Sequence, residues 1–236
     1  KTEAKQLESM VSFMQMINQI CMHLIRWILY LAPLGVFTLV SNILAKTPTD
    51  ILSNLGDFFI ATTLAALIHS CVTLPAIAYM LAKVNPVRFF WNVKKALLVA
   101  LSTASSSATL PVSMEVLTEK DNVKRKNAGF ILPFGATLNM DGSALYQALI
   151  VLFLAHLSGV ELSTSKQLVV FILVMLSSAG SAGIPGGGIV VVGITLDMLG
   201  IPMEMIGIYL LIDRFWDYPI TAINVWGDLV GAKVLD

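Results

Sequence analysis

Acidic residues inside apolar stretches are the part of this sequence most able to do chemistry. Asp141, Asp217 and Asp228 each lie within a stretch long enough to cross a membrane. A carboxylate at the bilayer centre costs roughly 2.5–3.5 kcal/mol on insertion scales, and the only arginines in these stretches are Arg26 and Arg214. Because basic partners are too few, we expect a cation to satisfy the acids: a metal ion, a proton or a substrate ammonium group. Protonation, or a hydrogen bond to a neighbouring helix, is the alternative for any one of them.

The last apolar stretch carries a polar stripe. Asp217, Thr221, Asn224 and Asp228 follow one another at steps of four, three and four residues, which places them on one face of a helix. A stripe with two carboxylates, a hydroxyl and an amide on an otherwise apolar helix is predicted to face a binding site rather than lipid.

Two further polar segments interrupt apolar stretches. Residues 139–143 combine Asn139 and Asp141 with Gly142, and Gly142 is expected to loosen a helix and free backbone carbonyls for a hard cation, which prefers oxygen ligands. Residues 105–107 are three serines, which at a hairpin tip would offer free N–H groups of a helix N-terminus to a carboxylate. The alternatives are a kink with a buried amide for the first segment and a surface loop for the second.

The composition indicates a bilayer as the solvent. Of 236 residues, 56% are hydrophobic and 13% are charged, whereas soluble domains carry about 25% charged residues. This balance, with zero net charge, excludes a disordered chain and a nucleic-acid binder and disfavours a soluble enzyme. Cys21 and Cys71 lie in apolar runs and indicate neither disulfides nor a metal cluster. The histidines have no ligand spacing and are assigned to packing or solvent contact: His23, His69 and His156.

Six apolar stretches predict an all-α membrane protein with transmembrane helices: residues 11–44, 58–81, 96–117, 129–157, 168–199 and 205–235. The loops 83–95 and 118–127 are both rich in Lys and Arg, so the positive-inside rule places both in the cytoplasm. The stretch between them is therefore predicted to be a re-entrant hairpin. The loop 197–204 has acids and no base, which makes 168–199 a second hairpin that enters from outside.

Two oppositely oriented hairpins, each followed by a polar-interrupted helix, predict an inverted-repeat transport core of the kind found in secondary transporters. The expected organisation is two membrane helices in 1–86 and a core in 87–236. Within the core we expect a hairpin at 88–118, an interrupted helix at 127–157, a second hairpin at 167–200 and a last helix at 204–235. Because the chain begins at Lys1, it is expected to be a fragment or a processed chain.

Four motifs, in this order, resemble the dicarboxylate/amino acid:cation symporter family of glutamate and neutral amino acid transporters. They are residues 105–111 (SSSATLP), 135–147 (GATLNMDGSALYQ), 182–186 (AGIPG) and 224–228 (NVWGD). The resemblance covers essentially the whole chain and implies the C-terminal transport core of a multi-pass protein of the cell membrane. It also implies that the scaffold helices, through which the family forms homotrimers, are not part of this chain.

The resemblance implies three sites for co-transported sodium ions. Asp228 would ligate the first, together with the backbone carbonyls of Gly135, Asn139 and Asn224. Asp141 and the Asn139 side chain would hold the second, whose other ligands belong to an absent helix. The third would be formed by four backbone carbonyls when the second hairpin closes: those of Thr137, Ser178, Ala179 and Ser181.

The resemblance also implies a site for an amino acid substrate. Asn224 and the hairpin serines Ser105 and Ser106 would bind its α-carboxylate, and Asp217 its α-ammonium group. The groups that would close around it are Ser143, Thr221 and the backbone at Ile184 and Gly188.

Ile220 departs from the pattern of the acidic-substrate members, which have an arginine there for the side-chain carboxylate. A buried carboxylate without its base is costly, so the departure favours a neutral α-amino acid; an acidic amino acid or dicarboxylate symporter coupled to sodium or protons is the alternative. Gln147 replaces a glutamate of the proton- and potassium-coupled members, which predicts sodium symport without potassium countertransport. Pro219 and Trp226 also depart from the pattern.

The expected mechanism is elevator-type alternating access by a symporter, which is not an enzyme. Two other classes of membrane protein fit the sequence less well. An intramembrane protease would need a GxGD or GxSG context or a base for Ser106, and the sequence has none of these. A channel with two pore loops would differ in its flux, which would not saturate at slow, sodium-coupled rates.

Overall fold

The computed structural model describes residues 49–179 and 186–236, together with scattered positions between Met10 and Ser41; for 49–54 it describes the backbone alone. The chain divides into two compact units, Lys1–Lys46 and Thr47–Asp236. In the first unit the described positions are helical, and most of the stretch 11–44 lies outside the described residues.

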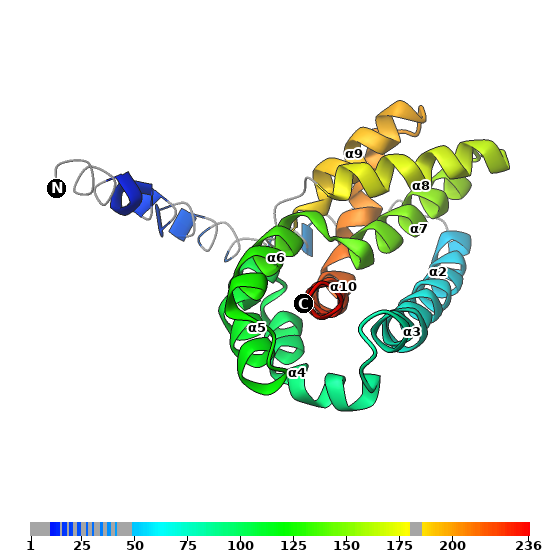
Figure 1. The fold of residues 1–236 in the computed structure, drawn as a ribbon. Helices are drawn as coiled ribbons and strands as arrows, with labels where there is room; N and C mark the ends of the chain where they lie inside the picture. Colours follow the sequence, from blue (N-terminus) through cyan, green and yellow to red (C-terminus); the bar gives the residue numbers. More distant parts are fainter. Residues whose placement is uncertain are drawn as a thin grey trace. The chain divides into compact units, whose positions relative to one another are not determined.

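Over the described part of the second unit the chain is helical and contains no strand. Its elements, of which Figure 1 labels the α-helices, are α2 (Thr49–Ile68), the π-helix η1 (His69–Thr73), α3 (Leu74–Met80), α4 (Pro86–Thr103), α5 (Ser106–Lys120), α6 (Arg125–Leu138), α7 (Asp141–Leu157), α8 (Thr164–Ser178), α9 (Gly188–Met198), the 3-10 turn η2 (Met203–Met205) and α10 (Ile206–Val234). Among the described residues, two runs are apolar and long enough to cross a membrane, Leu55–Met80 and Arg125–Leu157.

α10 lies at the centre of this unit. In Figure 1 it is seen nearly end-on, with α3, α4, α5, α6 and α7 around it, and it contacts each of them. Its second half is buried from Ile220 to Val230, with the exception of Ala222. Residues that reach α10 from different helices are therefore brought together, although they are distant in sequence.

Helices α4 and α5 form the first helix pair and pack together. Asn85 caps α4 by accepting a hydrogen bond from the Arg88 N–H, and Pro86 begins the helix. The chain reverses at Ala104, which has the left-handed φ of 48°, and Ser105 then caps α5 by accepting from the Ala108 N–H at 3.2 Å. The serine segment is thus the tip between two helices, and Ala104, Ser105 and Ser106 are all buried.

Helices α8 and α9 form the second helix pair and also contact each other. Ser163 caps α8, and residues 180–185 of the connection lie outside the described residues. Gly186 resumes the chain with a left-handed φ of 79°, a conformation that glycine adopts without strain.

The interruption between α6 and α7 is confined to Asn139 and Met140. Gly142 lies in the first turn of α7, so the prediction that it loosens the helix is wrong. Its lack of a side chain serves close packing instead: a Cβ there would lie 3.0 Å from both Asn224 Oδ1 and the Ile220 carbonyl oxygen.

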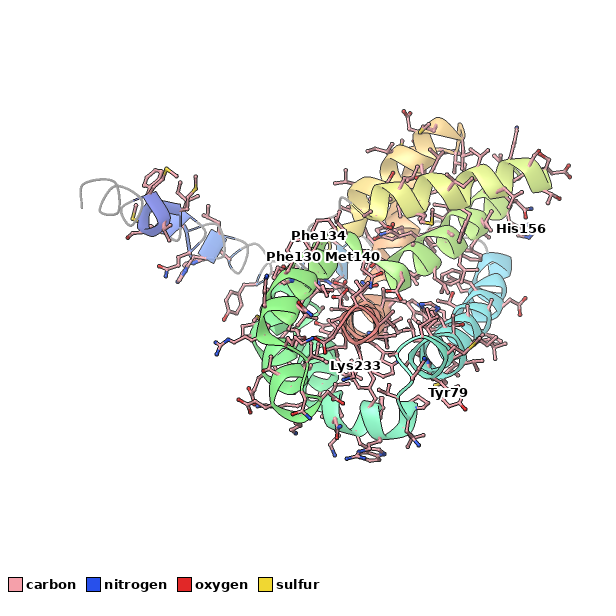
Figure 2. The ribbon with its side chains drawn as sticks, viewed as in Figure 1. Tyr79, Phe130, Phe134, Met140, His156 and Lys233 are labelled. Carbon is pink, nitrogen blue, oxygen red and sulfur yellow. The ribbon has the colours of Figure 1, made fainter. Side chains whose placement is uncertain are left out.

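Large apolar side chains lie on the outside of this unit. Phe130 and Phe134 stack with ring centroids 6.1 Å apart, point outward from α6 in Figure 2, and are 72% and 59% exposed. Leu168 and Leu176 of α8 are exposed to a similar degree. Exposed apolar surface on this scale is typical of a chain whose neighbours are lipid or other protein rather than water.

Candidate cation and substrate site

Asp228 and Asn139 form the centre of the candidate cation site. Asn139 Nδ2 donates to Asp228 Oδ1 at 3.0 Å, which joins the α6–α7 break to α10. Asp228 is only 5% exposed, and the break leaves the last carbonyls of α6 without helical partners. The negative end of the α6 dipole therefore faces the same place as a buried carboxylate, which is an environment for a cation.

Asp141 stands at the start of α7, on the other side of the break. Its Oδ2 lies 2.8 Å from Nε2 of His69, whereas its Oδ1 is buried and has no hydrogen-bond partner among the described residues. One oxygen of this carboxylate is therefore occupied by the protein, and the other is available to a ligand.

Two glycines make room for these carboxylates. A Cβ at Gly135 would lie 2.5 Å from Asp228 Oδ1, and a Cβ at Gly227 would lie 2.7 Å from Asp141 Oδ2 and 2.9 Å from Asn139 Nδ2. Real Cβ contacts are essentially never shorter than 3.0 Å. The two acids and the amide thus occupy space that any larger residue at Gly135 or Gly227 would take from them.

The donor set fits a hard monovalent cation. Carboxylate, amide and backbone carbonyl oxygens are the ligands that such ions prefer, whereas transition metals favour nitrogen and sulfur. Within the ranges that the structure describes, no group of three or more His, Cys, Asp or Glu side chains gathers at one place.

Asn224 joins α10 to the first turn of α7. Its Oδ1 accepts from the Ser143 N–H at 3.1 Å, and its Nδ2 donates to Ser143 Oγ at 2.8 Å. The structure therefore brings together two residues predicted to contact substrate. Thr221, one turn earlier on the same face of α10, is also buried, at 6% exposure.

Asp217 lies where the connection between α8 and α9, the second helix pair, meets α10. Its Oδ2 accepts from the Gly186 N–H at 3.3 Å and is 3.8 Å from Arg214 Nη1, one turn earlier. Basic partners were expected to be too few for the three deep acids. Asp217 has Arg214 within 3.8 Å, and Asp141 has the ring nitrogen of His69, which is charged only if it is protonated. Asp228 has the Asn139 amide instead.

The remaining residues predicted to bind sodium or substrate differ in burial and in their place in the helices. Ile220 and Ser178 are buried, at 3% and 2% exposure. The Thr137 side chain is exposed and donates to the Phe134 carbonyl of its own helix. Gly188 begins α9, where a Cβ would lie 2.6 Å from the Tyr209 hydroxyl. Ala179 ends α8. Two predicted residues lie outside the described residues, Ser181 and Ile184.

His69 is a site residue that its position in the sequence does not predict. The sequence favours packing or solvent contact for it, whereas its ring nitrogen lies 2.8 Å from Asp141. A signal was present, because a histidine stands in the middle of an apolar stretch. The partner, 72 residues away, could be found only in three dimensions.

Helices with exposed apolar side chains, packed around buried acids, amides and the break between α6 and α7, are typical of a membrane transport protein. The sequence model of the sodium:dicarboxylate symporter family matches residues 1–236, and the chain belongs to that family. It is 37% identical over 230 residues to mouse neutral amino acid transporter B(0), which aligns 97% of this chain with 42% of the mouse protein. Human neutral amino acid transporter A is 34% identical over the same length, covering 43% of that protein.

The chain thus spans about two fifths of the length of these relatives. The family and the relatives are transporters, not enzymes.

Proposed function

We propose that this chain is the ion- and substrate-binding part of a sodium-coupled symporter for neutral α-amino acids in the cell membrane. The observation that carries the proposal is the cluster of Asp228, Asn139 and Asp141, which brings two carboxylates and an amide to the break between α6 and α7. The names of the family and of the relatives support the same class of transport.

Two of the three sodium ions in this proposal bind before the substrate. The first is at Asp228, with the carbonyls of Gly135, Asn139 and Asn224. The second is at Oδ1 of Asp141, the buried oxygen without a hydrogen-bond partner among the described residues. The Asn139 side chain and ligands from outside this chain complete it. The 3.0 Å contact between Asn139 Nδ2 and Asp228 Oδ1 supports coupling between the two, because both ions depend on one amide.

A third sodium ion and the substrate bind as the second hairpin closes. The Gly186 N–H, in the connection between α8 and α9, donates to Asp217. The carboxylate that would receive the α-ammonium group is therefore also in contact with the second hairpin. Closure over the substrate then permits movement of the whole unit relative to its scaffold, which is elevator-type alternating access. The ions favour substrate binding, and the substrate favours ion binding by the same factor.

The substrate is neutral because Ile220 presents a buried apolar side chain where a side-chain carboxylate would need a base. Arg214 does not replace that base, since it lies within 3.8 Å of Asp217 and is held by it. Gln147 is buried at 3% exposure and carries no titratable proton, which supports transport without potassium countertransport. Assembly as a homotrimer through scaffold helices beyond this chain completes the proposal.

The test uses the complete protein in liposomes. Uptake of labelled alanine, serine and glutamine is compared with uptake of aspartate and glutamate, with an inward gradient of sodium or of choline. We expect saturable uptake of a neutral amino acid that requires sodium and is insensitive to internal potassium. Faster uptake of aspartate than of any neutral candidate would favour the acidic alternative, and uptake independent of sodium would refute the proposal.

A further inference from the structure

The membrane-length run 55–80 is not a regular helix, because a π-helical segment, His69–Thr73, interrupts it. The Leu74 N–H bonds to the His69 carbonyl five residues earlier, and Pro75 has no N–H to donate. π-helical turns are rare and occur frequently at functional sites. The segment is therefore a place to ask what its side chains do.

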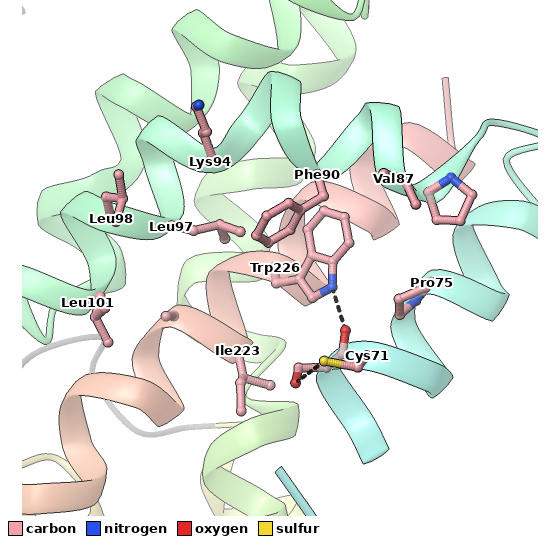
Figure 3. A pocket seen from close by; sticks show the side chains of 13 residues that line it. Cys71, Pro75, Val87, Phe90, Lys94, Leu97, Leu98, Leu101, Ile223 and Trp226 are labelled. Atoms are coloured by element: carbon pink, nitrogen blue, oxygen red, sulfur yellow. Dashed lines mark hydrogen bonds between the residues drawn. The ribbon is translucent and has the colours of Figure 1, made fainter. Parts of the chain in front are cut away.

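The π-helical segment is held on α10 by Trp226. Trp226 Nε1 donates to the Ser70 carbonyl at 3.2 Å, the contact drawn as a dashed line in Figure 3. The Trp226 ring is 4% exposed and lies against Phe89, with centroids 5.3 Å apart. This role accounts for the tryptophan that departs from the family pattern, and it places His69, one residue earlier, beside α7.

His69 acts on one oxygen of Asp141 only. Its Nε2 lies 2.8 Å from Oδ2, and an ionised carboxylate only accepts hydrogen bonds, so Nε2 is the donor. Oδ1 stays buried and without a partner among the described residues. Gly227 limits the carboxylate from the other side, because a Cβ there would meet Oδ2 at 2.7 Å.

We propose that His69 is a positioning residue for the cation site at Asp141. Its Nε2–H fixes Oδ2, which sets the plane of the carboxylate and directs Oδ1 to the ion. The π-helical turn and the Trp226 hydrogen bond keep the histidine in place. The inference rests on the proposed function, since it takes Asp141 as a sodium ligand. It adds a residue of this chain to a site whose remaining ligands were expected from an absent helix.

The expected magnitude follows from metal sites in general. Partners that orient a metal ligand typically change metal affinity about 10–100-fold when they are removed. A residue that only ties two helices together would instead lower the stability of the protein in the absence of sodium and leave the affinity of the folded protein for sodium unchanged.

The test compares His69→Ala, His69→Gln and His69→Asn in the complete protein. Glutamine places its amide nitrogen close to the position of Nε2, whereas asparagine is too short to do so. His156→Ala is the matched control, because His156 is exposed and lies on the same helix as Asp141, at its far end in Figure 2. Sodium binding to the substrate-free protein is followed by tryptophan fluorescence, and melting temperatures are measured without sodium.

We expect His69→Ala and His69→Asn to raise the half-saturating sodium concentration about 10–100-fold, with His69→Gln much closer to wild type and His156→Ala unchanged. The KM for substrate at saturating sodium should move little. A half-saturating concentration within twofold of wild type for His69→Ala would overturn the proposal. If that variant does not fold, equal sodium affinities of the Gln and Asn variants would overturn it. A wild-type protein without sodium binding would instead refute the proposed function itself, and this role with it.

Discussion

Replacing Gly227 by alanine is the most direct perturbation of the ion site. The new Cβ would lie 2.7 Å from Asp141 Oδ2 and 2.9 Å from Asn139 Nδ2. Ordinary van der Waals contact begins at 3.4 Å, so the two groups would have to withdraw by about 0.7 and 0.5 Å. These are the groups proposed to hold one sodium ion, and Asn139 also contacts Asp228.

Overpacking of a well-packed site typically costs about 1–3 kcal/mol. If the Asp141 and Asn139 side chains withdraw in the sodium-free protein, the ion can bind only when they return. The cost of overpacking then lowers the affinity for sodium. Since 1.4 kcal/mol corresponds to tenfold in affinity, we expect the affinity for sodium to fall roughly 5–150-fold. The stability without sodium should change less, because alanine gains roughly 0.5–1 kcal/mol over glycine in a helix.

Gly231→Ala is the matched control. Gly231 lies one turn later on α10, and its Cβ would meet nothing within 4 Å. Both variants are titrated with sodium by calorimetry on the substrate-free complete protein, and their melting temperatures are recorded with and without sodium. The sodium-dependent rise in melting temperature should shrink in Gly227→Ala and persist in Gly231→Ala. Equal sodium affinities in the two variants would refute the placement of the ion between Asp141 and Asn139.

Three further predictions concern specificity, the hairpin tip and the end of α10. Ile220→Arg should shift the kcat/KM ratio of aspartate to alanine upward at least about tenfold, since a side-chain carboxylate is costly to bury without its base; an unchanged ratio in liposome uptake would contradict the neutral-substrate argument. Ala104→Gly should stabilise the protein by about 1 kcal/mol, because a left-handed φ strains a residue with a Cβ, and an unchanged or lower melting temperature would count against it. Lys124 precedes α6 as its N-cap, and its N–H donates to Asp236 Oδ1. This hydrogen bond is the main cause that lowers the pKa of Asp236. The stabilisation by Asp236 is therefore present above the ordinary pKa of aspartate and is lost as the pH falls through the lowered value; hydrogen exchange at the start of α6 should show this loss in wild type and not in Asp236→Ala.

The amino-acid sequence by itself determined the class of protein and the face of the last helix. Apolar stretches of membrane length, with few charges, disfavour an ordinary soluble domain. The helical period places Asp217, Thr221, Asn224 and Asp228 on one face, and this depends only on local geometry. The motifs that carry the family resemblance are also local, so they were readable without a structure.

Only the tertiary structure decided which of these groups meet. The contact of Asn139 with Asp228 spans 89 residues, and that of His69 with Asp141 spans 72, so neither follows from a repeat or a spacing along the chain. The role of Gly142 is a further example. A glycine beside a polar interruption predicts a loosened helix, whereas in the folded chain its missing side chain leaves room for Asn224. Contacts between helices depend on how the whole chain packs around α10, and no local pattern encodes that packing by itself.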